Sequence, residues 1–403
     1  CPAVNIVVDP TKKYQFVEGF GGAVTDAAGI NWKNLSEPLQ KLLVDSYFSD
    51  KGLQYNMIRT HIGGCDFSTH PYAYNDLPVN DTKLSNFTLT KEDHQYKDEI
   101  LKLLNTPIHV VAATWSPPPW MKTNNDYAGA SRLRPEYYET YADYHYKFIE
   151  KYDAEGIRIW AISTGNEPSD GVVPLNWFNS LGWTKCQFLM FQGDWIAYNL
   201  GPKIKNSTYK DVKILASDDQ RLSLPYWVTK MFKDQPKAIP YIDGVAVHFY
   251  TDFISPASLL TSVMAPYPQK FLLATEACRG SNPWDRPKVA IGSWQRAYDY
   301  ITDIITDLNH NVVGWIDWNL CLNAEGGPNW AGNKVDAPII VYPERNEFIK
   351  QPMFYAMGHF SKFIPRGSQR VQTIQKKSFL STSIENVAFI TPNKTVVVVF
   401  YNK

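Results

Sequence analysis

Eight short apolar, β-branched runs recur through the 403 residues, and an amphipathic helical stretch follows most of them. Runs that are apolar throughout are typical of strands buried on both faces, as in a parallel sheet covered by helices. Eight strand–helix units over about 350 residues predict a (β/α)8 TIM barrel in the α/β class. The predicted strands are residues 16–24, 55–62, 108–115, 157–164, 212–217, 244–250, 271–275 and 312–318.

The helical stretches support this architecture over its alternative, a doubly wound open sheet. No Gly-x-Gly-x-x-Gly or Walker loop follows any of the runs, as would be expected in many nucleotide-binding open sheets. The predicted helices are residues 37–47, 98–104, 135–152, 185–200, 225–232, 256–264, 295–308 and 352–363.

The two ends of the chain have a different pattern. Residues 3–8 form a lone predicted strand, and residues 370–374, 387–391 and 396–401 predict an antiparallel meander without helices. We therefore expect residues 1–15 to give the N-terminal strand of a small antiparallel β domain. Residues 16–364 would form the catalytic barrel, and residues 365–403 the rest of the β domain, truncated where its last strand reaches a turn.

Composition excludes several classes of protein. Lys and Arg number 40 and Asp and Glu number 40, so the basic surplus of a nucleic-acid binder is missing. No apolar run reaches the roughly 18 residues of a transmembrane helix. The five cysteines include no Cys-x-x-Cys pair, which argues against a zinc ribbon. The 13 Trp and 24 Tyr residues suit a site that stacks on flat, weakly polar ligands.

Five Asn-x-Ser/Thr tripeptides support a secretory route. The chain begins with Cys1 and shows no signal peptide, so we interpret it as a fragment or a processed form. The candidate glycosylation sites are Asn34, Asn80, Asn86, Asn206 and Asn393.

Catalytic residues of such barrels gather at the C-terminal ends of the strands. Glu167 follows the fourth predicted strand within Asn-Glu-Pro, and Glu276 follows the seventh. Two carboxyl groups among aromatic and amide side chains are what glycoside hydrolysis requires: one protonates the leaving oxygen and the other attacks the sugar or activates water. The strand ends carry no serine nucleophile elbow, metal-ligand cluster or phosphate loop.

Each of these residues also has a structural interpretation. A glutamate at a strand end can be a solvated loop residue, although the Asn-Glu-Pro context favours a catalytic Glu167. Taken alone, His248 reads as a core histidine, and Trp115 could belong to the barrel core. Arg59, inside the second strand, would be costly to bury unpaired, so we expect it to pair with a carboxylate of the site.

Segments along nearly the whole chain resemble the lysosomal glucosylceramidases (acid β-glucosidases) of glycoside hydrolase family 30. They include Glu-Gly-Phe-Gly-Gly-Ala-Val-Thr-Asp at 18–26, Trp-Ser-Pro at 115–117, Asn-Glu-Pro-Ser at 166–169, Asp-Asp-Gln-Arg-Leu at 218–222, Glu-Ala-Cys at 276–278, Asp-Trp-Asn-Leu at 317–320, Gly-Gly-Pro-Asn-Trp at 326–330 and Gln-Pro-Met-Phe-Tyr at 351–355. One departure is Gly165, where vertebrate members carry an acidic residue, so the electrostatics around Glu167 are expected to differ.

The resemblance implies a retaining exo-β-glucosidase that hydrolyses glucosylceramide in sphingolipid catabolism. Glu167 matches the acid/base and Glu276 the nucleophile. The residues matching the glucose pocket are Asp66, Trp115, Asn166, His248 and Trp318, and those matching the pocket mouth are Phe178, Gln220, Tyr250, Cys278 and Asn333. The resemblance further implies no cofactor or metal, a lysosomal or secreted enzyme peripheral to the membrane, and a saposin-type activator protein with anionic lipid as partners.

Two other functions stay open. A related β-glycosidase could act on xylosides or β-glucans, and a catalytically silent relative could bind glycolipid as a carrier or lectin. We also expect Cys65 and Cys278 to be free thiols. For a retaining pair, the carboxyl groups should lie about 5–5.5 Å apart. The negative charge of Glu276 is expected to raise the pKa of Glu167 and give an acidic optimum.

Overall fold

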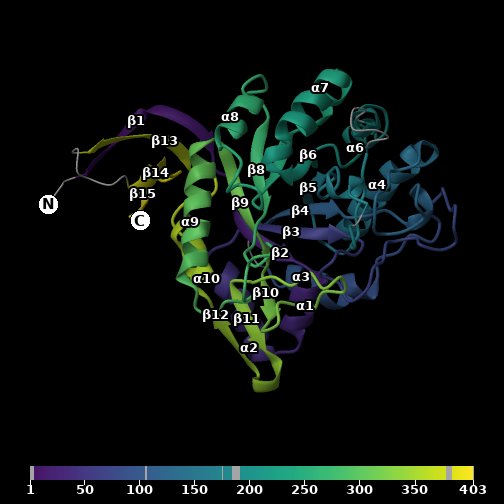
Figure 1. Ribbon diagram of the computed structural model, residues 1–403, viewed down its shortest axis with the longest axis horizontal. Coiled ribbons are helices and arrows are strands. Elements are labelled where there is room, and N and C mark those ends of the chain that lie inside the picture. Colours follow the sequence, from purple (N-terminus) through teal and green to yellow (C-terminus); the bar gives the residue numbers. More distant parts are fainter. Residues whose placement is uncertain (1–3, 105–106, 175, 184–190, 378–383, 403) are drawn as a thin grey trace.

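Eight parallel strands close into a barrel in chain order, from β2 to β9 (Figure 1). The computed structural model describes residues 4–104, 107–174, 176–183, 191–377 and 384–402. The barrel confirms the predicted (β/α)8 architecture. Its strands are β2 Gly19–Val24, β3 Met57–Ile62, β4 His109–Thr114, β5 Ile159–Ser163, β6 Lys213–Gln220, β7 Gly244–His248, β8 Phe271–Glu276 and β9 Val312–Asn319.

Side chains from successive strands fill the barrel interior. One apolar cluster joins Met57 of β3 and Val111 of β4 to Leu215, Leu273 and further residues of β5, β7 and β9. In β2, a Cβ atom at Gly21 would lie 1.9 Å from the Met57 carbonyl oxygen. Only glycine fits there, so β2 and β3 can approach closely.

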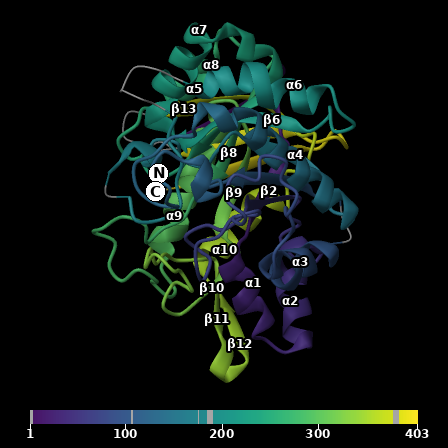
Figure 2. The same cartoon turned by 90° about the vertical axis from the view of Figure 1, so that its right-hand side faces the viewer.

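Helices surround the barrel, and Figure 2 shows α5 to α8 gathered at one end of the molecule with α1 to α3 at the other. The helices are α1 Asp26–Lys33, α2 Glu37–Phe48, α3 Asp98–Lys102, α4 Tyr138–Ala154, α5 Phe191–Trp195, α6 Gly201–Lys205, α7 Met231–Asp234, α8 Ser258–Met264, α9 Trp294–Asn309 and α10 Pro352–Ser361. None of the helices in the described residues is long and apolar enough to cross a membrane.

The helix prediction differs from the structure in several places, among them residues 185–200 and α1. Residues 185–190 of the helix predicted at 185–200 lie outside the described residues, and the remainder forms α5 and the π-helical turn η5 Ile196–Leu200. Helix α1 was not expected, because the run of small residues before it continues the apolar pattern of β2. Thr25 caps this helix by accepting a hydrogen bond from the backbone N–H of Ala28.

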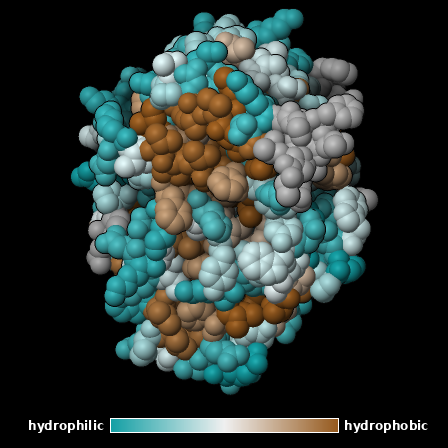
Figure 3. Space-filling view, turned by 90° about the vertical axis from the view of Figure 1, so that its left-hand side faces the viewer, coloured by the Kyte–Doolittle hydropathy of each residue, from teal (hydrophilic) through white to brown (hydrophobic). Residues whose placement is uncertain are grey.

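A four-stranded antiparallel sheet in the order β1-β13-β14-β15 lies beside the barrel (Figure 1). As predicted, it joins the N-terminal strand to the C-terminal meander. The first and last strands of the chain, β1 and β15, are the two edge strands of this sheet. Val396 and Phe400 on β15 are exposed, and Figure 3 shows apolar surface on this side of the molecule. The strands are β1 Val4–Phe16, β13 Gln369–Lys377, β14 Glu385–Ile390 and β15 Val396–Tyr401.

A three-stranded sheet after β9 was not predicted. Its strands are too short to show a clear alternation, and β10 pairs with β11 in parallel while β12 pairs with β11 antiparallel. The loop between β10 and β11 carries residues 324–338 back to the barrel mouth, where it contributes to the site below. The strands are β10 Cys321–Asn323, β11 Ile339–Tyr342 and β12 Glu347–Lys350.

Candidate active site

Glu167 lies in the turn after β5 with an unusual backbone conformation. Its φ is +39°, in the left-handed region that glutamate seldom adopts, and its N–H donates to the Asp218 carbonyl at 2.9 Å. Its side chain is 14% exposed. The Oε1 atom lies 2.7 Å from Nδ1 of His248 and accepts a hydrogen bond of 2.7 Å from Nε2 of Gln220. The turn therefore holds this carboxylate in a fixed orientation at the barrel mouth.

Glu276 is the last residue of β8, and its side chain is 7% exposed. Its Oε1 accepts a hydrogen bond of 2.8 Å from the Tyr250 hydroxyl, and its Oε2 pairs with the Arg59 guanidinium. A carboxylate oxygen of Glu276, one of Glu167 and a ring nitrogen of His248 lie within 4.8 Å of one another. Inverting enzymes need about 6.5–9.5 Å between their carboxyl groups to admit water, whereas the close approach of these two oxygens agrees with the shorter spacing of a retaining pair.

Arg59 connects the two halves of the site. It is fully buried on β3 and donates to Asn166 Oδ1 at 2.7 Å and to Asp218 Oδ2 at 2.9 Å, besides pairing with Glu276. Its guanidinium lies 4.9 Å from the ring centroid of Trp115. The expectation that Arg59 pairs with a carboxylate of the site is confirmed.

Asp218 was missed as part of the site, although the sequence carried a signal. It is one of two adjacent aspartates that follow the apolar part of a predicted strand, and an aspartate must be paired when it is buried. In the structure it is fully buried on β6 and lies 3.0 Å from Nε2 of His248 and 2.9 Å from Arg59. Asp218 therefore fixes both cations of the site.

His248 carries a positive charge in this arrangement. Burial acts to lower its pKa, but Glu276, Asp218 and Glu167 together raise the pKa to about 10. Since its two ring nitrogens face Glu167 and Asp218, both nitrogens can donate as imidazolium. The reading of His248 as an isolated core histidine is wrong, because it is buried between two carboxylates.

The expected direction of the pKa shift of Glu167 is also wrong. Burial acts to raise the pKa of Glu167, but the hydrogen bond and charge of His248 outweigh burial and lower that pKa below its ordinary value. For Glu276, burial raises the pKa, against the opposing effects of Arg59 and His248. The cause missing from the sequence argument was the imidazolium beside Glu167.

Aromatic side chains form one wall of the site. The rings of Trp115 and Trp318 are stacked with centroids 5.4 Å apart and an angle of 19° between their planes. They belong to an apolar cluster that also includes Cys65 and Cys278, with Phe178 and Tyr250 packed against it. Two flat indole rings beside a carboxylate pair suit the C–H face of a sugar.

The cysteine prediction is confirmed for the residues that the structure describes. Cys65, Cys278 and Cys321 are buried free thiols. The Tyr250 hydroxyl lies 3.5 Å from Cys278 Sγ, which places this thiol next to the residue that holds Glu276. Cys1 and Cys186 lie outside the described residues.

Asp66 is held by the loop between β10 and β11. Its Oδ2 accepts hydrogen bonds from the side-chain amides of Asn329 at 3.1 Å and Asn333 at 3.0 Å. Burial, followed by the charge of Glu276, raises the pKa of Asp66 to about 7. Asn329 was not expected here, because no local pattern reveals that its loop returns to the barrel mouth.

The structure thus gathers the predicted residues around one point, in three sets of contacts. Hydrogen bonds and ion pairs connect Glu167, Glu276, Asn166, Gln220, His248 and Tyr250. Apolar packing connects Trp115, Trp318, Phe178 and Cys278. Asp66 and Asn333 are hydrogen-bonded to each other.

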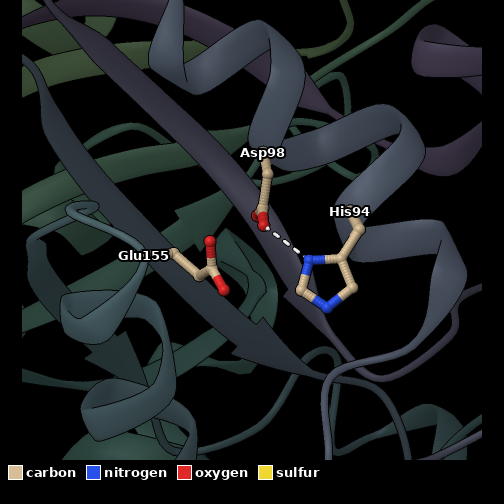
Figure 4. A group of neighbouring side chains, drawn as sticks. All are labelled: His94, Asp98 and Glu155. Atoms are coloured by element: carbon tan, nitrogen blue, oxygen red, sulfur yellow. Dashed lines mark hydrogen bonds and ion pairs between the residues drawn. The ribbon is translucent and has the colours of Figure 1, made fainter.

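Two further acidic groups lie outside this site, and each holds its own basic side chain. His94, Asp98 and Glu155 approach one another beside α3 and α4 (Figure 4), where Lys102 lies 2.7 Å from Glu155. The other group consists of three aspartates around Arg221. Lysine and arginine thus act as counter-ions for both groups. The three aspartates around Arg221 are Asp252, Asp303 and Asp307.

The family comparison covers both parts of the chain. The Glycosyl hydrolase family 30 TIM-barrel domain matches residues 17–364, and the Glycosyl hydrolase family 30 beta sandwich domain matches residues 367–403. The chain is 45% identical over 407 residues to a Lysosomal acid glucosylceramidase of Mus musculus, covering 99% of this chain and 77% of that protein.

Two further similarities agree. The chain is 45% identical over 377 residues to Putative glucosylceramidase 3 of Caenorhabditis elegans, covering 92% of this chain and 71% of that protein. The crystal structure of SrfJ from Salmonella typhimurium superposes with a TM-score of 0.87 at 27% identity, covering 100% of this chain and 88% of that one. With a closed barrel, a close carboxylate pair at its mouth and this match over nearly every residue, the chain belongs to glycoside hydrolase family 30.

Proposed function

We propose that the chain is a retaining exo-β-glucosidase that hydrolyses glucosylceramide to glucose and ceramide in sphingolipid catabolism. The observation that carries the chemistry is the close pair of Glu167 and Glu276, with oxygens within 4.8 Å. The similarity to glucosylceramidases over nearly the full chain supports the substrate.

In the first step, Glu276 is the nucleophile and Glu167 the acid. The Glu276 carboxylate attacks the anomeric carbon, while Arg59 and the Tyr250 hydroxyl hold it in position. Glu167 gives a proton to the glycosidic oxygen as the bond to ceramide breaks. The product of this step is a glucosyl ester of Glu276 and free ceramide.

In the second step, Glu167 acts as a base. It takes a proton from a water molecule as the water oxygen attacks the anomeric carbon and the ester bond to Glu276 breaks. Glu276 attacks the anomeric carbon from the face opposite the departing ceramide, and water then attacks from the face that ceramide has left. The two inversions together retain the β configuration in the released glucose.

The polar groups around the pair are proposed to bind the glucose hydroxyls. Asp66 and Asn166 present oxygens and amides at fixed positions, since Asn333 holds Asp66 and Arg59 holds Asn166. The stacked rings of Trp115 and Trp318 would lie against the apolar face of the sugar. His248 and Gln220 fix the orientation of Glu167.

The ceramide portion is proposed to leave past Phe178, Tyr250 and Cys278 toward a membrane surface. Three aromatic side chains on loops that follow β5, β7 and β8 support this proposal: Trp177, Phe253 and Trp284 are 60–65% exposed. Since catalytic loops follow the same strand ends, these rings lie on loops at the side from which substrate arrives. Anionic lipid and a saposin-type activator are the proposed partners there.

A lysosomal or secreted location agrees with the candidate glycosylation sites. All five asparagines of the Asn-x-Ser/Thr tripeptides are exposed, so each is accessible to a glycan. Peptide mapping of the protein made in a secreting cell, before and after enzymatic removal of N-glycans, would test which of them are occupied.

A substrate panel tests the proposed function. Glucosylceramide in vesicles containing anionic lipid, an aryl β-glucoside, an aryl β-xyloside and a β-glucan would be compared at equal enzyme concentration. We expect turnover of both glucosides and release of β-glucose first. Preference for the xyloside or the glucan would favour the related glycosidases, and binding without turnover would favour a carrier or lectin. Release of α-glucose first would contradict the retaining mechanism.

A further inference from the structure

Asp170 lies next to Glu167 in space, although it was not predicted to belong to the site. It begins the short turn η4 Asp170–Val172, and its backbone N–H donates to the Glu167 carbonyl at 2.8 Å. This turn brings the two side chains together, and their carboxyl groups are hydrogen-bonded to each other. A second carboxyl group is therefore in direct contact with the acid/base.

A hydrogen bond between two carboxyl groups requires a proton, because two carboxylates can only accept. Glu167 also faces His248 and Gln220, both of which have hydrogens to donate. Both of these donors meet the same oxygen, Oε1 of Glu167, and the charged His248 favours the ionised form of Glu167. In the contact between the two carboxyl groups we therefore take Glu167 as the acceptor and Asp170 as the donor. In the free enzyme the shared proton resides on Asp170.

The charges facing the pair agree with this placement. Burial, followed by the negative charge of Glu167 and that of Asp219 on β6, raises the pKa of Asp170 to about 9. On the other side, the imidazolium of His248 on β7 and the guanidinium of Arg59 on β3 lower the pKa of Glu167. The ionised Glu167 that results is the wrong form for protonating a leaving group.

We propose that Asp170 is a positioning residue that stores the proton used by Glu167, so that the two carboxyl groups act as one pair with one shared proton. The proposal rests on the acid/base function proposed for Glu167. When substrate binds, the proton moves from Asp170 to Glu167, which gives it to the glycosidic oxygen as the glycosidic bond breaks. Glu167 then takes a proton from the attacking water and returns it to Asp170.

Holding the loop does not require the Asp170 carboxyl group. The loop is fixed through Ser169, whose N–H and hydroxyl each donate to Asp219 at 2.9 Å. Of Asp170, the backbone carbonyl accepts hydrogen bonds from the N–H of Val173 and the side chain of Asn176. The carboxyl group is thus free to serve Glu167, and Ser169→Ala is a matched control for a merely structural effect.

The pH dependence of kcat/KM tests the proposal with two substrates. Octyl β-glucoside has a poor leaving group that needs the proton, and a dinitrophenyl β-glucoside has one that leaves without it. Without Asp170, Glu167 faces His248 alone and loses its proton at lower pH. For Asp170→Asn with the octyl glucoside, we expect the falling alkaline limb to move to lower pH by about one unit or more. The pH dependence of kcat/KM for the dinitrophenyl β-glucoside should not change.

Either of two results would overturn the proposal: an octyl glucoside limb that does not move in Asp170→Asn, or an equal movement in Ser169→Ala. Failure of the proposed function is distinguishable, because wild-type enzyme would then hydrolyse neither glucoside. In that case, infrared spectra at pH 7 decide. Wild type should show one more protonated-carboxyl C=O band than Asp170→Asn, and equal bands would contradict the stored proton.

Discussion

One carboxylate oxygen of Glu167 and one of Glu276 lie within 4.8 Å of each other, but different kinds of contact hold the two side chains. Glu167 is in a strained turn and shares its proton with a neighbouring carboxyl group, next to an imidazolium. Glu276 ends a regular strand and is fixed by a guanidinium and a phenol. The difference matches the proposed chemistry, since an acid/base must gain and lose a proton whereas a nucleophile must stay ionised.

The difference in chemistry also explains why the two residues differ in backbone conformation. A nucleophile needs one position, which a strand end provides with little strain. An acid/base that exchanges protons with Asp170 and a substrate, and is held by His248, needs its carboxylate to meet several partners. The left-handed turn at Glu167, secured by the Asp218 carbonyl, presents it to all of them.

The largest effect is expected on the Glu276 side. Glu276→Gln removes the nucleophile, so the glucosyl ester cannot form, and kcat should fall by roughly 10⁴-fold or more for every substrate. Steady-state turnover of octyl and dinitrophenyl β-glucosides would measure this loss. Azide rescue of this variant that yields β-glucosyl azide would mean that the roles of the two glutamates are reversed.

On the Glu167 side, the effect should depend on the leaving group. Glu167→Gln should reduce turnover of glucosylceramide by roughly 10²–10⁴-fold, because ceramide needs a proton to leave. Formation of the glucosyl enzyme from a dinitrophenyl β-glucoside should be little affected, as measured by the burst of dinitrophenol. Azide should restore turnover and give β-glucosyl azide. An equal loss for both substrates would contradict acid catalysis by Glu167.

Arg59 is the residue that both sides share. Arg59→Met would leave Asp218 and Glu276 without their buried cation, and we expect a loss of roughly 3–5 kcal/mol in the free energy of unfolding. The matched control is Arg221→Met, which removes a buried arginine from the three aspartates elsewhere. Urea unfolding of both variants should show comparable destabilisation. At temperatures where both stay folded, activity should fall strongly in Arg59→Met alone.

The smallest expected effect concerns the pKa of Glu276. The Tyr250 hydroxyl lowers the pKa of Glu276, so Tyr250→Phe should raise that pKa. Because Glu276 acts ionised, the rising acidic limb of kcat/KM should then move to higher pH by about one unit or less. Tyr300→Phe, which removes a buried hydroxyl bonded to Asp317, is the control and should leave the limb in place. A limb that moves equally in both variants would contradict the account.

The sequence predicted the barrel, whose strands are buried on both faces. Eight apolar runs sufficed for the barrel, because strands covered on both faces leave a clear pattern. Helix α1 and the sheet of β10 to β12 were missed, since an alanine- and glycine-rich helix and strands of three or four residues have too little periodicity to stand out.

For the site, strand ends pointed to Glu167 and Glu276, and the resemblance added the residues around them. What the sequence could not provide was the charge arrangement. The pKa shift of Glu167 was predicted in the wrong direction because His248, 81 positions away in the sequence, contacts Glu167. Likewise, the contact of Asp170 with Glu167 depends on a turn that begins with a left-handed residue, which no local pattern announces.

Trapping the covalent intermediate tests the division of roles most directly. A deoxyfluoro glucosyl fluoride slows the second step and leaves the enzyme as its glucosyl ester. After proteolysis, mass spectrometry would locate the ester. The account predicts one label per chain, on Glu276, with none in Glu276→Gln. A label on Glu167 or Asp170, or the absence of any covalent adduct in an enzyme that still turns over glucosides, would contradict it.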